Sequence, residues 1–84
     1  MIQTVQEINK ELRKRYESIE VNGTQCFLAG SVVVRVDTFQ GCFVVEYANN
    51  IDEAEKNIFE DGDLIEITEN SLENIISEIE DSKE

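Results

Sequence analysis

The sequence contains no histidine, proline or tryptophan, and only two cysteines among its 84 residues. The lack of histidine excludes the usual zinc ligand sets and a histidine-based catalytic triad. Cys26 and Cys42 both lie in apolar, strand-like segments, which favours small buried side chains over a disulfide framework. A disulfide between Cys26 and Cys42 is the alternative, and it requires a strand register that brings the two side chains together. The sequence thus indicates no metal site and no cofactor.

Long apolar runs are also absent. No apolar segment approaches the roughly 20 residues that span a membrane. The first ten residues, Met1–Lys10, lack the basic start and apolar centre of a signal peptide. We therefore expect a cytoplasmic protein that has no membrane partner.

The length of 84 residues predicts a single domain, residues 1–84. A domain of this size buries only about 60% of the surface that its unfolded chain exposes, so it holds one core and no deep active-site cleft. No motif fixes a reaction, and a carboxylate pair for acid–base catalysis needs a cleft with contrasting environments. We expect that the protein is not an enzyme.

Positive charge is scarce and unevenly distributed. Seven lysines and arginines stand against 19 acidic residues, which gives a net charge of −12 at pH 7. Residues 1–45 hold five residues of each sign, whereas residues 46–84 hold 14 acidic residues and two lysines. All of the excess negative charge therefore lies in the second half, which cannot bind nucleic acid directly.

The stretch Ser31–Tyr47 is the most strongly patterned part of the chain. Alternate valines predict a strand over Val32–Val36, and the alternation in Cys42–Tyr47 predicts its return strand. A turn is expected at Gln40-Gly41, because glycine supplies the positive φ that a tight turn needs. Before this stretch, the Asn22-Gly23 pair predicts a hairpin between residues 19–21 and 24–28. Ala29-Gly30 marks either a bend in one long strand or a second turn.

Helical spacing predicts a first helix over about Gln3–Tyr16, with Thr4 and Glu7 as a capping box. Its last turns carry a basic cluster: Lys10, Arg13, Lys14 and Arg15. Such a cluster is typical of a solvated helix face, and the alternative interpretation is a contact with phosphate.

A second, short helix over about Glu53–Phe59 is predicted, with Asp52 as its N-cap and Asp61-Gly62-Asp63 as its stop. Leu64–Ile67 is either a fourth strand or an irregular segment. A final helix begins at Asn70 or Ser71 and places four apolar side chains on one face: Leu72, Ile75, Ile76 and Ile79. These elements predict an α+β fold with a three- or four-stranded antiparallel sheet, an N-terminal helix and one or two C-terminal helices that cover one face.

The acidic cluster between the second helix and the end of the last predicted strand is a candidate calcium loop, because hard cations bind oxygen ligands. Its members are Glu60, Asp61, Asp63 and Glu66. The spacing does not match an EF-hand, in which a glycine at a fixed position precedes a glutamate at the twelfth position. We therefore expect no metal here.

A second interpretation is electrostatic. Repeated exposed carboxylates can be steered into a basic groove built for DNA or RNA. The predicted contact residues are Glu60, Asp61, Asp63, Glu66, Glu69 and Glu73. The alternatives are acids that only keep the protein soluble, an immunity or antitoxin-type protein against a basic toxin, and a small structural or adaptor module that dimerises through a sheet edge or the last helix. The sequence leaves monomer and homodimer open.

The order of an N-terminal helix, the strand segments IEVNGTQCFLAG, SVVVRV and CFVVEYANN, and acidic helices resembles small phage-encoded inhibitors. It is similar in particular to acidic anti-CRISPR proteins that occupy the DNA-binding surface of a type II CRISPR nuclease. The segment EYANNIDEAEKNIFEDGDLIEI also resembles uncharacterised small phage or prophage proteins. The resemblance implies a DNA-mimicking inhibitor whose partner is a basic nucleic-acid-binding protein, such as a CRISPR nuclease.

Overall fold

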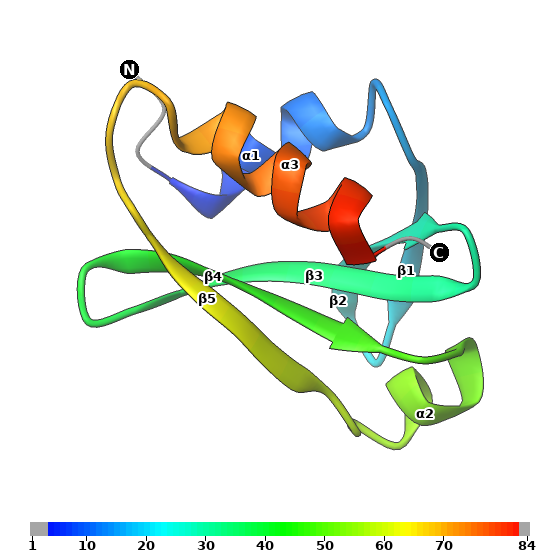
Figure 1. The fold of residues 1–84 in the computed structure, drawn as a ribbon. Helices are drawn as coiled ribbons and strands as arrows, with labels where there is room; N and C mark the ends of the chain where they lie inside the picture. The colour runs from blue at the N-terminus through cyan, green and yellow to red at the C-terminus, as the bar shows by residue number, and fades with distance from the viewer. Residues whose placement is uncertain (1–3, 83–84) are drawn as a thin grey trace.

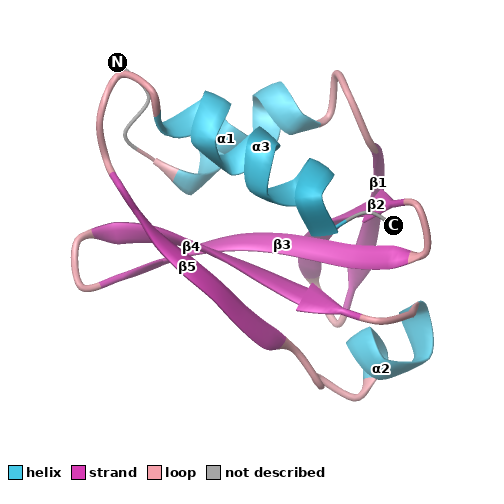
Figure 2. Cartoon of the chain, viewed as in Figure 1, coloured by secondary structure: helices cyan, strands magenta, loops and turns pink. Residues whose placement is uncertain are grey.

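The computed structural model describes residues 4–82, which form one five-stranded sheet and three helices. The strands are antiparallel and follow the chain order β1-β2-β3-β4-β5, so β1 and β5 are the two edges. In chain order the elements are α1 (Val5–Leu12), β1 (Glu17–Val21), β2 (Thr24–Ala29), β3 (Val32–Phe39), β4 (Cys42–Ala48), α2 (Ile51–Glu55), β5 (Glu60–Glu66) and α3 (Ser71–Ser82). The predicted α+β class is confirmed, but the sheet has five strands instead of the three or four that the sequence predicted (Figures 1 and 2).

The extra strand arises because Ala29-Gly30 belongs to a second turn rather than to a bend. Ala29 pairs directly with Val32, and Gly30 has φ +64°, so a two-residue loop separates β2 from β3. The hairpins predicted at Asn22-Gly23 and Gln40-Gly41 are confirmed. Both residues of each pair have positive φ, as a type I′ turn requires.

The helices cover both faces of the sheet. Helices α1 and α3 lie together on one face, and the short α2 lies on the other (Figure 1). The prediction that all helices cover one face is therefore wrong for α2. It packs Ala54 against Val33 and Ala48 in a second, smaller buried cluster.

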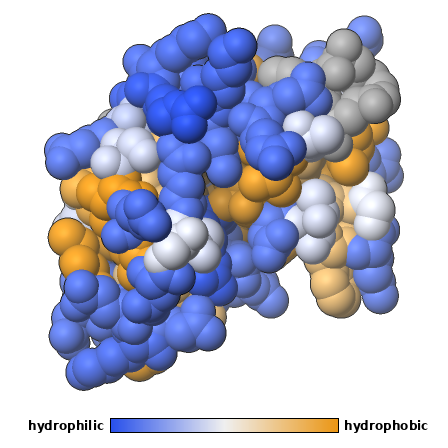
Figure 3. Space-filling model, turned by 180° about the vertical axis from the view of Figure 1, so that it is seen from behind, coloured by the Kyte–Doolittle hydropathy of each residue, from blue (hydrophilic) through white to orange (hydrophobic). Residues whose placement is uncertain are grey.

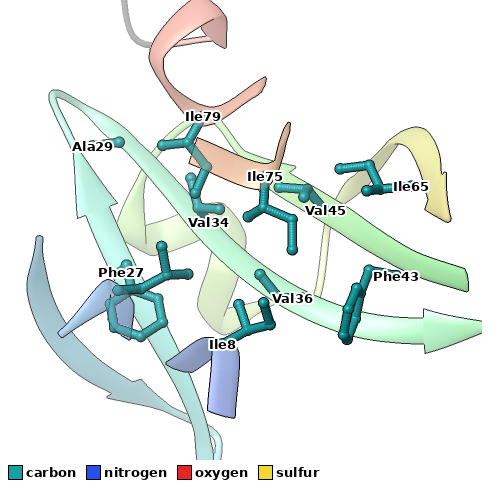
Figure 4. Close-up of a cluster of buried hydrophobic side chains, with 11 residues drawn as sticks. Ile8, Phe27, Ala29, Val34, Val36, Phe43, Val45, Ile65, Ile75 and Ile79 are labelled. Carbon is teal, nitrogen blue, oxygen red and sulfur yellow. The ribbon is translucent and has the colours of Figure 1, made fainter. Parts of the chain in front are cut away.

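The main core lies between the sheet and the pair α1 and α3. Figure 4 shows Ile8 of α1 beside Phe27 and Val36, and Ile75 and Ile79 of α3 above the strands. All of these side chains except Val36 are fully buried. Over residues 4–82, no helix has both the length and the apolar character needed to cross a membrane.

Three predicted helix boundaries are wrong: the end of α1 and both ends of α2. The capping box of Thr4 and Glu7 is confirmed, but α1 ends at Leu12 and not at Tyr16, because residues 13–15 turn toward β1. The predicted start at Gln3 lies outside the described residues. Helix α2 is capped by Asn50, whose side chain accepts the Glu53 amide at 2.8 Å, two residues before the predicted cap.

Helix α2 also ends earlier than predicted, at Glu55, because Asn57 adopts a left-handed conformation with φ +60°. The segment Asp61-Gly62-Asp63 does not stop a helix. It lies inside β5, which begins at Glu60. Of the two alternatives for Leu64–Ile67, the strand is therefore correct, although this strand starts earlier than Leu64 and ends at Glu66.

Gly62 lies where the register between β4 and β5 shifts, between Val44 and Glu46. A Cβ atom at Gly62 would lie 2.9 Å from the Val45 carbonyl oxygen and 2.9 Å from Cε2 of Tyr47, and it would also meet Oε1 of Glu78. Real Cβ atoms do not approach this closely. The absence of a side chain at Gly62 therefore allows the bulge, as glycine commonly does in strand interiors.

We expect Gly62→Ala to lower the free energy of unfolding by about 1–3 kcal/mol, since the Val45 carbonyl cannot move away without disturbing β4. Urea denaturation measures this value. Removing the Glu78 side chain in addition relieves only the contact with its carboxylate, so we expect the double variant to stay below the parent protein. Equal stability of Gly62→Ala and the parent protein would contradict the tight packing at this bulge.

Candidate functional site

The six acidic residues predicted as a contact surface are all exposed. Four of them lie on β5, a free edge of the sheet, and two follow it: Glu60, Asp61, Asp63 and Glu66 on the strand, Glu69 in the loop to α3 and Glu73 in the first turn of α3. We call these six residues the acidic edge. The structure therefore places them along one continuous segment of the surface.

The acidic edge faces both sides of the sheet. Asp61 pairs with Glu46, on the side that points away from α1 and α3. Asp63 instead lines a hollow with Tyr47 and Glu78, on the side of α3. The six carboxylates therefore wrap around the rim of the molecule and do not form one flat patch.

No ion pair neutralises the acidic edge within residues 4–82. The ion pairs in this part of the chain join Lys14 to Glu11, Arg35 to Glu46 and Lys56 to Asp52. The basic end of α1 lies beside β2, three strands away from β5 in the sheet, where Arg13 donates a hydrogen bond to Gln25 at 3.3 Å. Helix α3, which has no basic residue in its last turn, contacts β5.

Charges on an edge strand have a structural effect of their own. An unpaired strand edge offers free N–H and C=O groups to other chains, and charged side chains and bulges oppose such pairing. Strand β5 has both features, four acids and the bulge at Gly62. The acidic edge therefore discourages β-augmentation and leaves its carboxylates available to a partner that binds through side chains.

The hollow beside Asp63 gathers oxygen atoms without forming a metal site. Tyr47, Asp63, Glu78 and Asp81 are among the residues that line it, and Glu78 accepts the Asp63 amide at 3.0 Å. Among the described residues no three carboxylates or cysteines are arranged to hold a metal ion. Burial raises the pKa of Tyr47 above its usual value, and the nearby Glu78 charge adds to the rise.

Tyr16 lies on the opposite side of α3, beside Ile76 and Glu80. Its hydroxyl donates a hydrogen bond to the Glu80 carboxylate. Burial, followed by this hydrogen bond, raises the pKa of Tyr16 to about 12. Both tyrosines thus favour the neutral form when the chain is folded, against a reference pKa of about 10 in an unfolded chain.

These pKa shifts predict alkaline destabilisation. The stabilising contribution of a raised tyrosine pKa is complete below about pH 10 and is lost as the pH rises from there toward the folded-state value. We expect the midpoint of thermal unfolding to fall above about pH 10, and the double variant Tyr16→Phe, Tyr47→Phe to lose less stability over the same range. Since the chain has two tyrosines and no tryptophan, near-ultraviolet absorbance follows their ionisation directly. Ionisation of both tyrosines near pH 10 in the folded protein would contradict this prediction.

Both cysteines are free, Cys26 buried and Cys42 half-buried, as expected for small apolar side chains. Burial raises the pKa of the Cys26 thiol, which makes it unreactive near neutral pH.

Sequence reasoning missed the acidic residues that β3 and β4 add beside β5. Asp37 and Glu46 lie on the same face as Asp61, although they belong to the strands read as core. Their parity within β3 and β4 was a signal, since both alternate with buried valines. Their closeness to Asp61 depends on the pairing of β4 with β5, whose register could not be predicted from the sequence.

Comparisons of the chain with protein-family models, curated proteins and solved structures found no match.

Proposed function

We propose that the protein is an acidic inhibitor that binds the nucleic-acid-binding surface of a basic protein and acts as a DNA mimic. The observation that supports this proposal is the acidic edge: six exposed carboxylates, four on the edge strand β5 and two just after it, with no ion pair to any residue of the described chain. Uncompensated charge of one sign raises the rate of association with a surface of the opposite sign.

The spacing of the carboxylates supports mimicry of one DNA strand. Seven residues of β5 extend over about 20 Å at roughly 3.3 Å per residue, and they carry four carboxylates. One strand of B-DNA carries about six phosphates over the same length, at roughly 3.4 Å each. Glu69 and Glu73 follow the strand, in the loop to α3 and in the first turn of α3. The charge density is lower than that of DNA and of the same sign, which suits a groove lined with lysine and arginine.

The same geometry serves an immunity or antitoxin-type protein that neutralises a basic toxin, and the two functions differ in the partner. Capture from host lysate at low and at high salt, with the purified chain as the bait, identifies the partner. We expect the captured protein to be a basic nucleic-acid-binding protein, such as a nuclease, that is released as ionic strength rises. A partner that stays bound at high salt and does not bind nucleic acid would contradict the inhibitor proposal.

A further inference from the structure

A groove lies on the face of the sheet that points away from α1 and α3. The pairing of β3, β4 and β5 places Asp37, Val44 and Leu64 in one row across this face, and Phe39 lies two residues beyond Asp37 on the same side. The groove has a volume of about 300 Å³. This volume is at the lower limit of ligand pockets, so it suits one or two apolar side chains of a partner better than a cofactor.

The floor and walls of the groove are apolar. Phe39 is 55% exposed and Leu64 is 49% exposed, while Val44 between them is 7% exposed. None of the three belongs to either buried cluster, and the cluster beneath α2 on this face consists of other residues: Val21, Cys26, Val33, Ala48 and Ala54. Figure 3, which views the molecule from behind, shows that hydrophilic residues cover most of that side and that hydrophobic residues reach the surface in separate areas between them.

The rim of the groove is acidic. Asp37 and Asp61 are exposed on opposite sides of the apolar floor and form no ion pair within residues 4–82. Glu46 also lines the groove, but Arg35 neutralises it at 2.9 Å. The Arg35 guanidinium lies over the Phe59 ring at 3.7 Å, which directs it toward the segment after α2. The free charge at the rim is therefore negative.

We propose that this groove binds a basic amphipathic segment of the partner protein, which inserts a large apolar side chain between Phe39 and Leu64 and places lysine or arginine at Asp37 and Asp61. Apolar anchors in small pockets with a charged rim supply most of the binding energy in many interfaces. A nucleic acid is repelled by the rim. A second copy of the chain would bring Asp37 and Asp61 against the same acids across a twofold axis, which is unfavourable.

The groove and the acidic edge share Asp61, so one partner can contact both. The inference deepens the proposed function and rests on it, because it names the chemistry of the segment that a basic partner would present. The acidic edge supplies long-range attraction, whereas the groove supplies short-range apolar contact that salt does not screen.

Two synthetic peptides of equal positive charge test the groove: an amphipathic helix of leucine and lysine, and a peptide in which serine replaces each leucine. We expect the leucine peptide to bind the protein at least tenfold more tightly, and Phe39→Ser with Leu64→Ser to remove that difference. Both side chains are half-exposed, so the variant keeps its fold. Ile51→Ser with Ile58→Ser is the matched control, since these residues are 46% and 52% exposed but do not line the groove.

Alkylation of Cys42 gives an independent measure, because Cys42 pairs with Phe39 across β3 and β4 while Cys26 is buried. We expect the leucine peptide, and not the serine peptide, to slow the alkylation of Cys42.

Three results would overturn the proposal. The two peptides could bind equally, or the control variant could lose as much affinity for the leucine peptide as the groove variant does. The protein could also be a homodimer that dissociates when Phe39 and Leu64 are replaced by serine. If the groove variant still binds the partner captured from lysate but charge reversal at the acidic edge abolishes binding, the groove proposal fails and the inhibitor proposal stands.

Discussion

Replacement of Asp61, Asp63, Glu66 and Glu69 by lysine together is expected to weaken binding to the basic partner by about a hundredfold or more. Each exposed ion pair contributes roughly 0.2–1 kcal/mol, and reversal replaces four attractions with four repulsions, so the total loss is about 3 kcal/mol. All four residues are exposed and form no ion pair within residues 4–82, so the substitutions leave the core unchanged. Titration calorimetry with the purified partner measures the loss.

A control variant separates the position of the charges from their number. Glu17, Glu20, Asp52 and Glu55 are also exposed, and they lie on β1 and α2, outside the acidic edge. Their replacement by lysine changes the net charge by the same amount. We expect it to weaken binding far less than reversal at the acidic edge. Equal losses in the two variants would show that net charge alone, and not the acidic edge, attracts the partner.

Phe27→Ala is expected to give the largest loss of stability, about 3–5 kcal/mol. Phe27 is fully buried between α1 and the sheet, beside Ile8 (Figure 4), and neither helix nor strand can collapse into the space without moving the other. Domains of this size have little stability in reserve, so the loss approaches the whole free energy of folding. The midpoint of thermal unfolding should fall by at least about 12 °C.

Phe39→Ala is the matched control for that experiment. It removes the same atoms from a side chain that is 55% exposed and lies outside both buried clusters. We expect it to lower the free energy of unfolding by less than about 1 kcal/mol, as surface substitutions do. If Phe39→Ala destabilised the chain as much as Phe27→Ala, the assignment of Phe39 to an exposed groove would be wrong.

The elements that the sequence predicted well are those set by neighbouring residues. The hairpins at Asn22-Gly23 and Gln40-Gly41 follow from two residues that accept positive φ, and the capping box at Thr4 follows from a side chain three residues away. The boundaries of α2 were harder because Asn50 and Asp52 are both good N-caps, and the choice between them depends on where β4 ends.

Strand β5 was missed in part because its sequence, EDGDLIE, lacks the alternation of a half-buried strand. Only Ile65 is buried, and the bulge at Gly62 shifts the register between its two halves. The strand forms because β4 offers a free edge to pair with, which is a tertiary effect and not a local preference. The same pairing places Asp61 beside Glu46 and Leu64 beside Val44, so neither the wrapped acidic edge nor the groove could be predicted from the sequence.

Competition between the chain and DNA for the partner shows whether the chain is a DNA mimic. The captured protein is first bound to a labelled DNA duplex, and the chain is then titrated in at several salt concentrations. If the chain is a DNA mimic, it should displace the duplex completely, and its affinity should fall steeply as salt increases. A ternary complex of chain, partner and duplex, or an affinity that does not change with salt, would contradict DNA mimicry.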